Sequence, residues 1–167
     1  MRPLLRPRRL ARTVWEVEVG WLADQGIRGV LLDLDNTLVD WNQSWVRPQV
    51  RAWVEQARRG GLGLCLVSNA FWGKRVRRVA TELGLAAVVR AGKPLPRAFR
   101  RGMAALGTGP KDTCVIGDQV FTDMVGANWL GLMTILVSPL HPRESPHTRL
   151  IRLVEAPLRR RWARREG

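Results

Sequence analysis

Four short segments of this sequence carry residue types that could transfer a phosphoryl group. They are Asp33-Leu34-Asp35-Asn36-Thr37, Ser68-Asn69, Lys93-Pro94, and Gly117-Asp118 with Asp123. Paired carboxylates can supply a nucleophile and a proton donor, and a hydroxyl and an ammonium group can bind phosphate oxygens. A second acidic pair can complete a magnesium site. Together these residue types predict phosphoryl transfer through an aspartyl-phosphate intermediate.

The first segment supplies the predicted catalytic residues. Asp33 is the expected nucleophile and a magnesium ligand. Asp35 is expected to protonate the leaving oxygen and later to activate water. It lies two residues along the chain, on the same side as Asp33. Thr37 is assigned a supporting role.

The second and third segments supply the predicted phosphate contacts. Ser68 and Asn69, with their neighbouring backbone N–H groups, are expected to bind phosphate oxygens. Lys93 is expected to neutralise the phosphoryl group and to position Asp33.

The metal ligands are predicted from three of the acidic residues. Magnesium prefers carboxylate and carbonyl oxygens and keeps several waters, so Asp33, the backbone carbonyl of Asp35 and Asp118 would be sufficient. Asp123 is expected to hold a metal-bound water or to fix the lysine. Mg²⁺ is therefore the predicted cofactor.

Each segment alone also has an ordinary structural explanation. Residues 35–37 could form a turn, residues 68–70 a helix cap, and residues 117–118 the start of a loop. A bare Asp-x-Asp-x-Thr pattern arises by chance in about one of 50 chains of this length. The occurrence of all four segments in order, each beside a strand-like run, favours the catalytic interpretation.

The elements that must position these segments alternate between strand-like and helix-like patterns, which predicts an α/β fold with a parallel sheet. Strands are expected at residues 29–34, 62–67, 86–89, 113–117 and 133–137. Helices are expected at residues 47–59, 74–83, 95–106 and 123–129. Ligands bind beyond the carboxyl ends of parallel strands, so Asp33, Ser68 and Asp118 should converge there. The short connections between the segments leave no room for a cap domain.

The chain is predicted to form one domain with two basic ends. Residues 1–26 would form a basic N-terminal arm and helix, residues 27–140 the catalytic core, and residues 141–167 a basic amphipathic helix, with a kink possible at Pro157. The 28 basic residues outnumber the 14 acidic ones, which gives a net charge of +14. Such an excess attracts nucleic acid, acidic lipid surfaces or phosphorylated substrates.

The C-terminal segment carries an apolar stripe among its arginines, formed by Leu150, Val154, Leu158 and Trp162. One interpretation is peripheral binding to an anionic membrane, with Trp162 at the headgroups. The other is that the stripe packs on the sheet while the arginines face solvent.

Cysteine content and hydropathy predict a cytoplasmic protein, and the basic ends are the reason to expect peripheral contact with the inner face of the membrane. Cys65 and Cys114 lie in apolar strand-like runs without metal-ligand spacing, which indicates buried thiols in a reducing compartment. No apolar stretch reaches the length of a membrane span, and the N-terminal segment has no apolar core typical of a secretory signal.

The motifs resemble those of the haloacid dehalogenase (HAD) phosphohydrolases, and in particular the YqeG family of type III HAD phosphatases. The resemblance rests on residues 33–39, 67–69, 93–101 and 115–123, and it covers nearly the whole chain. This family is similar to the mitochondrial phosphatidylglycerophosphate phosphatases. The resemblance implies a Rossmann-like HAD core without a cap, magnesium dependence and a lipid phosphate substrate. Gly92 departs from the pattern, because a basic residue is expected before the lysine.

The leading hypothesis is a magnesium-dependent phosphatase that acts on phosphatidylglycerophosphate in phospholipid synthesis. One alternative is a soluble phosphatase for a nucleotide or sugar phosphate. Another is an RNA- or ribosome-binding protein on a HAD scaffold, since the net positive charge suits nucleic acid equally well. The oligomeric state stays open.

Overall fold

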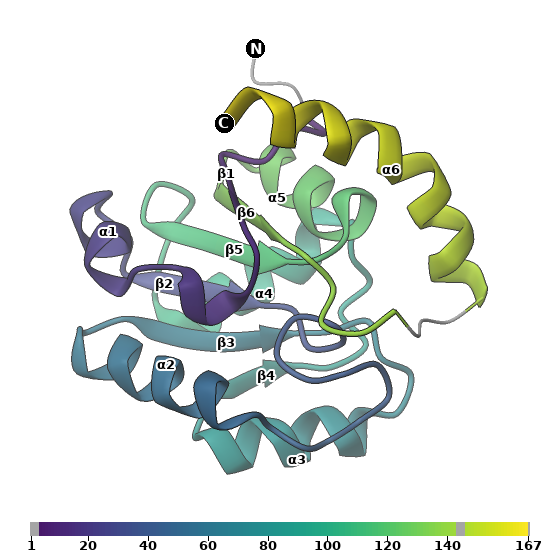
Figure 1. Cartoon of the computed structure of the whole chain (residues 1–167). Coiled ribbons are helices and arrows are strands. Elements are labelled where there is room, and N and C mark those ends of the chain that lie inside the picture. Colours follow the sequence, from purple (N-terminus) through teal and green to yellow (C-terminus); the bar gives the residue numbers. More distant parts are fainter. Residues whose placement is uncertain (1–3, 143–145, 167) are drawn as a thin grey trace.

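A six-stranded parallel sheet forms the centre of the computed structural model, which describes residues 4–142 and 146–166 (Figure 1). The strands are β1 (Arg9–Ala11), β2 (Gly29–Leu32), β3 (Gly63–Val67), β4 (Ala86–Val88), β5 (Thr113–Gly117) and β6 (Met133–Val137). Their order across the sheet is β1-β6-β5-β2-β3-β4. The α/β class predicted from the sequence is confirmed, with β1 as one strand more than the five expected.

The register brings the predicted site segments to one edge of the sheet. Leu32 at the end of β2 pairs with Leu66 in β3 and with Ile116 in β5. The strand order reverses between β2 and β5, because the chain first builds β3 and β4 on one side and then crosses to build β5 and β6 on the other. Ligand sites of open parallel sheets lie at such a reversal.

Helices cover both faces of the sheet (Figure 1). They are α1 (Val19–Asp24), α2 (Pro48–Arg59), α3 (Gly73–Leu83), α4 (Pro96–Leu106), α5 (Val125–Trp129) and α6 (Pro146–Glu166), with a 3-10 turn at Val14–Glu16 and a π-helical turn at Val120–Met124. Val30 and Leu32 of β2 belong to the apolar core on the side of α1, α2 and α3. Leu31 belongs to the core on the side of α4 and α5. This alternation along one strand is what a sheet buried on both faces requires.

The helix boundaries follow from proline and glycine. Pro48 and Pro96 stand in the first turn of α2 and α4, where a missing N–H costs no hydrogen bond. Gly84 and Gly107 end α3 and α4 with φ of 65° and 64°, a left-handed conformation that glycine adopts without strain.

Helix α6 packs on the core through only part of the predicted apolar stripe. Trp162 is buried, and with Leu158 it contacts an apolar cluster that also contains Val120 and Leu136. Leu150 and Val154 are exposed. The stripe is therefore not one continuous face: Leu158 and Trp162 pack against the core, whereas Leu150 and Val154 face solvent. Pro157 lies within the helix.

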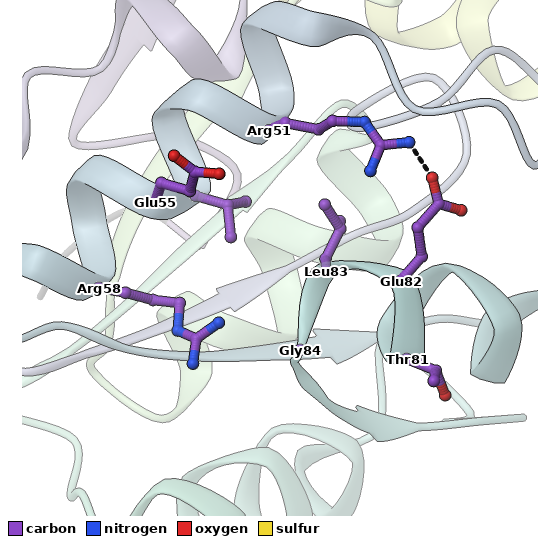
Figure 2. A pocket seen from close by; sticks show the side chains of 8 residues that line it. Arg51, Glu55, Arg58, Thr81, Glu82, Leu83 and Gly84 are labelled. Atoms are coloured by element: carbon purple, nitrogen blue, oxygen red, sulfur yellow. Dashed lines mark hydrogen bonds and ion pairs between the residues drawn. The ribbon is translucent and has the colours of Figure 1, made fainter.

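A groove between α2 and α3 is lined by residues outside the predicted site (Figure 2). Arg51 of α2 forms an ion pair with Glu82 of α3 across it, and Arg58 lies over Gly84. These contacts tie the two helices together. Within the described part of the chain, no helix is both long enough and apolar enough to cross a membrane.

Candidate active site

Asp33 lies directly beyond β2, where the strand order reverses. Its backbone N–H donates to the carbonyl of Ile116 (3.0 Å), so the chain is still held to β5 as it leaves the sheet. Its side chain is 11% exposed, and the Thr37 hydroxyl donates to its Oδ2 at 3.3 Å. The predicted nucleophile and the predicted supporting threonine are therefore in contact.

Lys93 joins the predicted nucleophile to a second acidic residue. Its Nζ lies 2.6 Å from Asp33 Oδ1 and 2.7 Å from Asp123 Oδ1, and its side chain is 3% exposed. Burial alone would lower the pKa of the Lys93 ammonium, but the Asp123 and Asp33 carboxylates raise that pKa above its usual value. Lys93 therefore stays charged and holds Asp33 in position. Asp123 fixes the lysine, which is one of the two roles expected for it.

The side chain of Asn69 has a different task from the phosphate contact predicted for it. Its Oδ1 accepts the backbone N–H groups of Gly92 (3.0 Å) and Lys93 (2.8 Å), and its Nδ2 donates to the carbonyl of Lys93 (2.9 Å). These three hydrogen bonds hold the backbone that carries Lys93 against the end of β3. Because the Asn69 side chain is occupied by these bonds, only its backbone N–H group is available for the predicted phosphate contact.

Three acidic side chains gather beside Lys93. Asp33, Asp118 and Asp123 each offer a carboxylate oxygen, and these oxygens all lie within 4.8 Å of one another. Gly117 permits this arrangement, because a Cβ atom there would collide with the carboxylate of Asp123. Asp118 is fully buried, and no hydrogen-bond partner for its Oδ1 is found in the part of the chain that the structure describes.

The electrostatics of this cluster favour a cation. Burial raises the pKa of Asp33, Lys93 opposes the rise, and the Asp123 carboxylate adds to it. Burial likewise raises the pKa of Asp118, Arg152 opposes the rise, and the carboxylates of Asp33 and Asp123 add to it. Carboxylates crowded away from water need positive charge close by. Hard divalent cations select such oxygen ligands, and the unpartnered oxygen of Asp118 is available to one. The cluster is therefore a candidate divalent-metal site.

Asp35 stands apart from the acidic cluster. Its Oδ2 accepts from Arg75 Nη2 (2.6 Å), and its Oδ1 accepts the backbone N–H of Asn42 (2.9 Å). Asn36, with φ of 61°, turns the chain after Asp35, and its N–H donates to the carbonyl of Val39 at 2.7 Å. Asparagine tolerates this left-handed conformation better than most residues. The turn places the side chain of Asp35 apart from the cluster of Asp33, Asp118 and Asp123, so only its backbone carbonyl stays an expected metal ligand. The proton-donor role of its carboxyl group stays a prediction.

Helix α6 supplies contacts to Asp118 that the sequence analysis did not predict. Arg152 Nη1 donates to the Asp118 carbonyl (2.5 Å), its Nη2 forms an ion pair with the Asp118 carboxylate, and Arg159 also donates to that carbonyl. The buried Glu155 accepts the backbone N–H groups of Val120 (2.7 Å) and Phe121 (3.1 Å). The one available signal was Glu155 itself, the single acidic residue among the arginines of residues 149–165.

A cavity of about 400 Å³ opens over the site. Its lining combines predicted site residues with aromatic ones, and includes Asp33, Asp35, Ser68, Asn69, Arg75, Trp41, Phe71 and Trp72. Ser68 Oγ accepts the N–H of Ala70 at 3.1 Å. Lys93, Asp118 and Asp123 join the cavity through their contacts with one another and with Asp33. No separate cap domain covers the cavity among the described elements.

Comparisons with known proteins agree with this geometry. The HAD-hydrolase-like family profile matches residues 90–139, which carry Lys93, Asp118 and Asp123. A crystal structure of an uncharacterized protein from Listeria monocytogenes serotype 4b is similar in fold, with a TM-score of 0.58 and 18% identity over 72% of this chain and 85% of that one.

Two curated proteins are similar over nearly the whole chain. The phosphatidylglycerophosphate phosphatase 1, chloroplastic/mitochondrial, of Arabidopsis thaliana is 27% identical over 160 residues, which are 90% of this chain and 45% of that protein. The probable phosphatase YqeG of Bacillus subtilis (strain 168) is 33% identical over 149 residues, which are 89% of this chain and 86% of that protein. With this similarity, and with its lysine and its acidic cluster at the ends of a parallel sheet, the chain belongs to the YqeG family of HAD-superfamily phosphatases.

Proposed function

We propose that this phosphatase depends on magnesium, works through an aspartyl-phosphate at Asp33, and hydrolyses the phosphomonoester of a lipid, with phosphatidylglycerophosphate as the leading candidate. One observation carries the chemistry: a buried lysine holds the carboxylate of Asp33 within 4.8 Å of the oxygens of Asp118 and Asp123. The proposed nucleophile and the candidate cation site therefore lie close enough together to act on the same phosphoryl group of a substrate.

In the first step, an oxygen of Asp33 attacks phosphorus, and the bond from phosphorus to the leaving oxygen breaks. Lys93 and the backbone N–H groups beside Ser68 bind the phosphoryl oxygens, whose charge is spread in the transition state. Mg²⁺, held by Asp33, Asp118 and the backbone carbonyl of Asp35, would supply further positive charge there. Asp35 gives its proton to the leaving oxygen.

In the second step, Asp35 takes a proton from water, and that water attacks the phosphorus of the aspartyl-phosphate. Inorganic phosphate leaves, and the carboxylate of Asp33 is restored. Arg75 pairs with Asp35 in the structure, at 2.6 Å. Both oxygens of Asp35 already accept hydrogen bonds, Oδ2 from Arg75 and Oδ1 from the backbone N–H of Asn42, so Asp35 must leave Arg75 before Oδ2 can carry a proton to the leaving oxygen. Exchange of this ion pair is therefore part of the proposed cycle.

Three features support a lipid substrate. The Arabidopsis relative is named a phosphatidylglycerophosphate phosphatase. The cavity lacks a cap in the described part of the chain, so a large leaving group can extend out of it. The net charge of +14 attracts the protein to anionic surfaces, which we propose as its peripheral location.

The test is a phosphate-release assay on purified protein, with and without Mg²⁺. Its panel contains phosphatidylglycerophosphate in mixed micelles, phosphatidic acid in the same micelles, a nucleoside monophosphate, a sugar phosphate and p-nitrophenyl phosphate. We expect Mg²⁺-dependent release that is fastest from phosphatidylglycerophosphate. A clear preference for the nucleotide or sugar phosphate would instead establish the soluble-substrate alternative, and no turnover on any ester would favour the nucleic-acid-binding alternative.

A further inference from the structure

Large aromatic side chains stand exposed on the two loops that border the active-site cavity. We call Trp41, Trp45, Phe71 and Trp72 the aromatic rim. Phe71 and Trp72 are each 69% exposed and Trp45 is 61% exposed. Trp41, Phe71 and Trp72 line the same cavity as the catalytic aspartates. A chain that buries Trp53 and Phe99 completely or nearly so has no packing reason to expose these rings together, and clustered exposed apolar residues indicate a contact surface.

The rim comes from two loops that the fold places beside the nucleophile. Trp41 and Trp45 belong to the segment between β2 and α2, and Phe71 and Trp72 to the connection between β3 and α3. Phe71 and Trp72 pack edge to face, with ring centroids 5.3 Å apart. These loops follow β2 and β3, the strands that lead to Asp33 and Ser68. A surface that binds the rim would therefore also lie over the cavity.

Basic side chains lie beside two of these rings, Arg90 beside Phe71 and Arg47, which also pairs with Asp40, beside Trp45. Arg90 Cζ lies 5.0 Å from the ring centroid of Phe71, and its Nε donates to the Phe71 carbonyl at 3.1 Å. Arg47 Cζ lies 5.8 Å from the ring of Trp45. Residues 70–78 contain one lysine, three arginines and no acidic residue. Aromatic rings bordered by long basic side chains suit the boundary between lipid headgroups and acyl chains.

We infer that the aromatic rim is a docking surface for an anionic phospholipid bilayer and presents the open cavity to it. Charge complementarity favours this occupant, because residues 70–78 and Arg90 add basic side chains beside the rim to a chain of net charge +14. A lipid phosphomonoester holds its phosphate at the headgroup plane. Rim side chains that enter this plane bring Asp33 toward the phosphate, so the lipid need not be extracted. The inference rests on the proposed function for its substrate, but binding to a bilayer requires no turnover.

This assignment differs from the one suggested by the C-terminal stripe. Trp162 is buried, and Arg152 and Arg159 turn inward to Asp118, so these residues cannot enter a membrane without leaving the core. The rim residues need no such rearrangement. Thr148, near the start of α6, lines the cavity as well, so the exposed first turns of that helix lie on the same side.

The test compares vesicle binding by the full chain and by two matched variants. Trp41→Ala/Trp72→Ala removes one ring of the cavity lining from each rim loop. Trp129→Ala removes a ring that is 67% exposed on α5 and does not line the cavity. Binding is measured by flotation with vesicles of phosphatidylglycerol and phosphatidylcholine, with pure phosphatidylcholine vesicles as the neutral arm. Circular dichroism and thermal unfolding establish that each variant is folded.

We expect binding to the anionic vesicles that weakens with salt, a loss of about tenfold or more in the rim variant, and a change of less than about twofold in Trp129→Ala. Equal binding by the rim variant and the wild type would overturn the inference. A dimer in sedimentation velocity that the rim variant dissociates, without vesicle binding by the wild type, would overturn it in favour of contact with a second copy.

The two proposals fail separately. Rim-dependent vesicle binding without hydrolysis of any lipid phosphate would support the docking surface and refute the proposed substrate. Hydrolysis of phosphatidylglycerophosphate in micelles together with rim-independent vesicle binding would refute the docking surface and support the proposed substrate.

Discussion

Replacement of Lys93 by methionine should destabilise the protein strongly, because it leaves two buried carboxylates without their shared cation. The side chains of Lys93, Asp33 and Asp123 are 3%, 11% and 1% exposed, and the two ion pairs measure 2.6 and 2.7 Å. Removal of one partner from a buried pair costs about 3–5 kcal/mol. In a domain of this size each kcal/mol lowers Tm by about 2–4 °C, so a fall of about 6–20 °C is expected.

The free energy of unfolding is measured by urea titration, followed by tryptophan fluorescence, in metal-free buffer. Lys111→Met, at an exposed lysine, is the matched control and should change this free energy by less than about 0.5 kcal/mol. A double variant, Lys93→Met/Asp123→Asn, should recover part of the loss, since it removes one of the two unpaired charges. If Lys93→Met lost less than about 1 kcal/mol, the assignment of Lys93 as the cation of a buried acidic pair would be refuted.

The stability lost on replacing Lys93 by methionine should depend on pH in one direction only. Burial raises the pKa of Asp33 even though Lys93 opposes the rise. Without Lys93 the pKa should rise further. A carboxyl whose pKa is higher in the folded state destabilises that state above this pKa and ceases to do so below its unfolded value of about 3.9. The difference in stability between Lys93→Met and the wild type should therefore narrow as the pH falls through the raised pKa of Asp33, and a difference that widened would contradict this reasoning.

Three further outcomes are expected. Asp33→Asn should abolish phosphate release with an unchanged circular dichroism spectrum, whereas Asp35→Asn should slow it by about 10²-fold or more; wild-type turnover in Asp33→Asn would refute the mechanism. Glu155→Ala should lower the free energy of unfolding in urea by about 1–3 kcal/mol, because the buried N–H of Val120 and the half-buried N–H of Phe121 lose their acceptor; an unchanged urea midpoint would show that Glu155 does not stabilise the turn at residues 120–124. Burial raises the pKa of Cys65 to about 11 and also raises that of Cys114, so neither thiol should react with a thiol reagent at mildly alkaline pH until the protein is denatured.

The strands that the sequence predicted most accurately are those with a local signal. The runs at Thr113–Gly117 and Met133–Val137 are mostly apolar, each is followed directly by a polar residue, and the structure gives them the predicted bounds. β1 was not predicted, because Arg9–Ala11 is a three-residue segment among arginines with no apolar run of its own. It becomes a strand through parallel pairing with β6, more than a hundred residues away. A pairing between residues so far apart in the sequence leaves no pattern in the residues around β1 from which the strand could be predicted.

The site shows the same division between local and long-range information. Asp33, Ser68 and Asp118 could be brought together from the sequence, since each follows a strand and parallel strands end at one edge. The ion pair of Arg75 with Asp35 could not, because it depends on how the segment after β2 folds over α3. The role of Asn69 as a support for Lys93 was also hidden, since a side-chain amide bonded to backbone leaves no spacing signature.

The charge around the acidic cluster links these observations to the C-terminal helix. Three carboxylates face two cations, Lys93 from the loop before α4 and Arg152 from α6. Arg152 pairs with Asp118 Oδ2 and donates to the Asp118 carbonyl, while Asp118 Oδ1 has no hydrogen-bond partner in the described part of the chain. A divalent cation at that oxygen could thus share Asp118 with Arg152 rather than displace it. The two α6 arginines that contact Asp118, Arg152 and Arg159, are therefore held at the acidic cluster and are not available to an anionic surface.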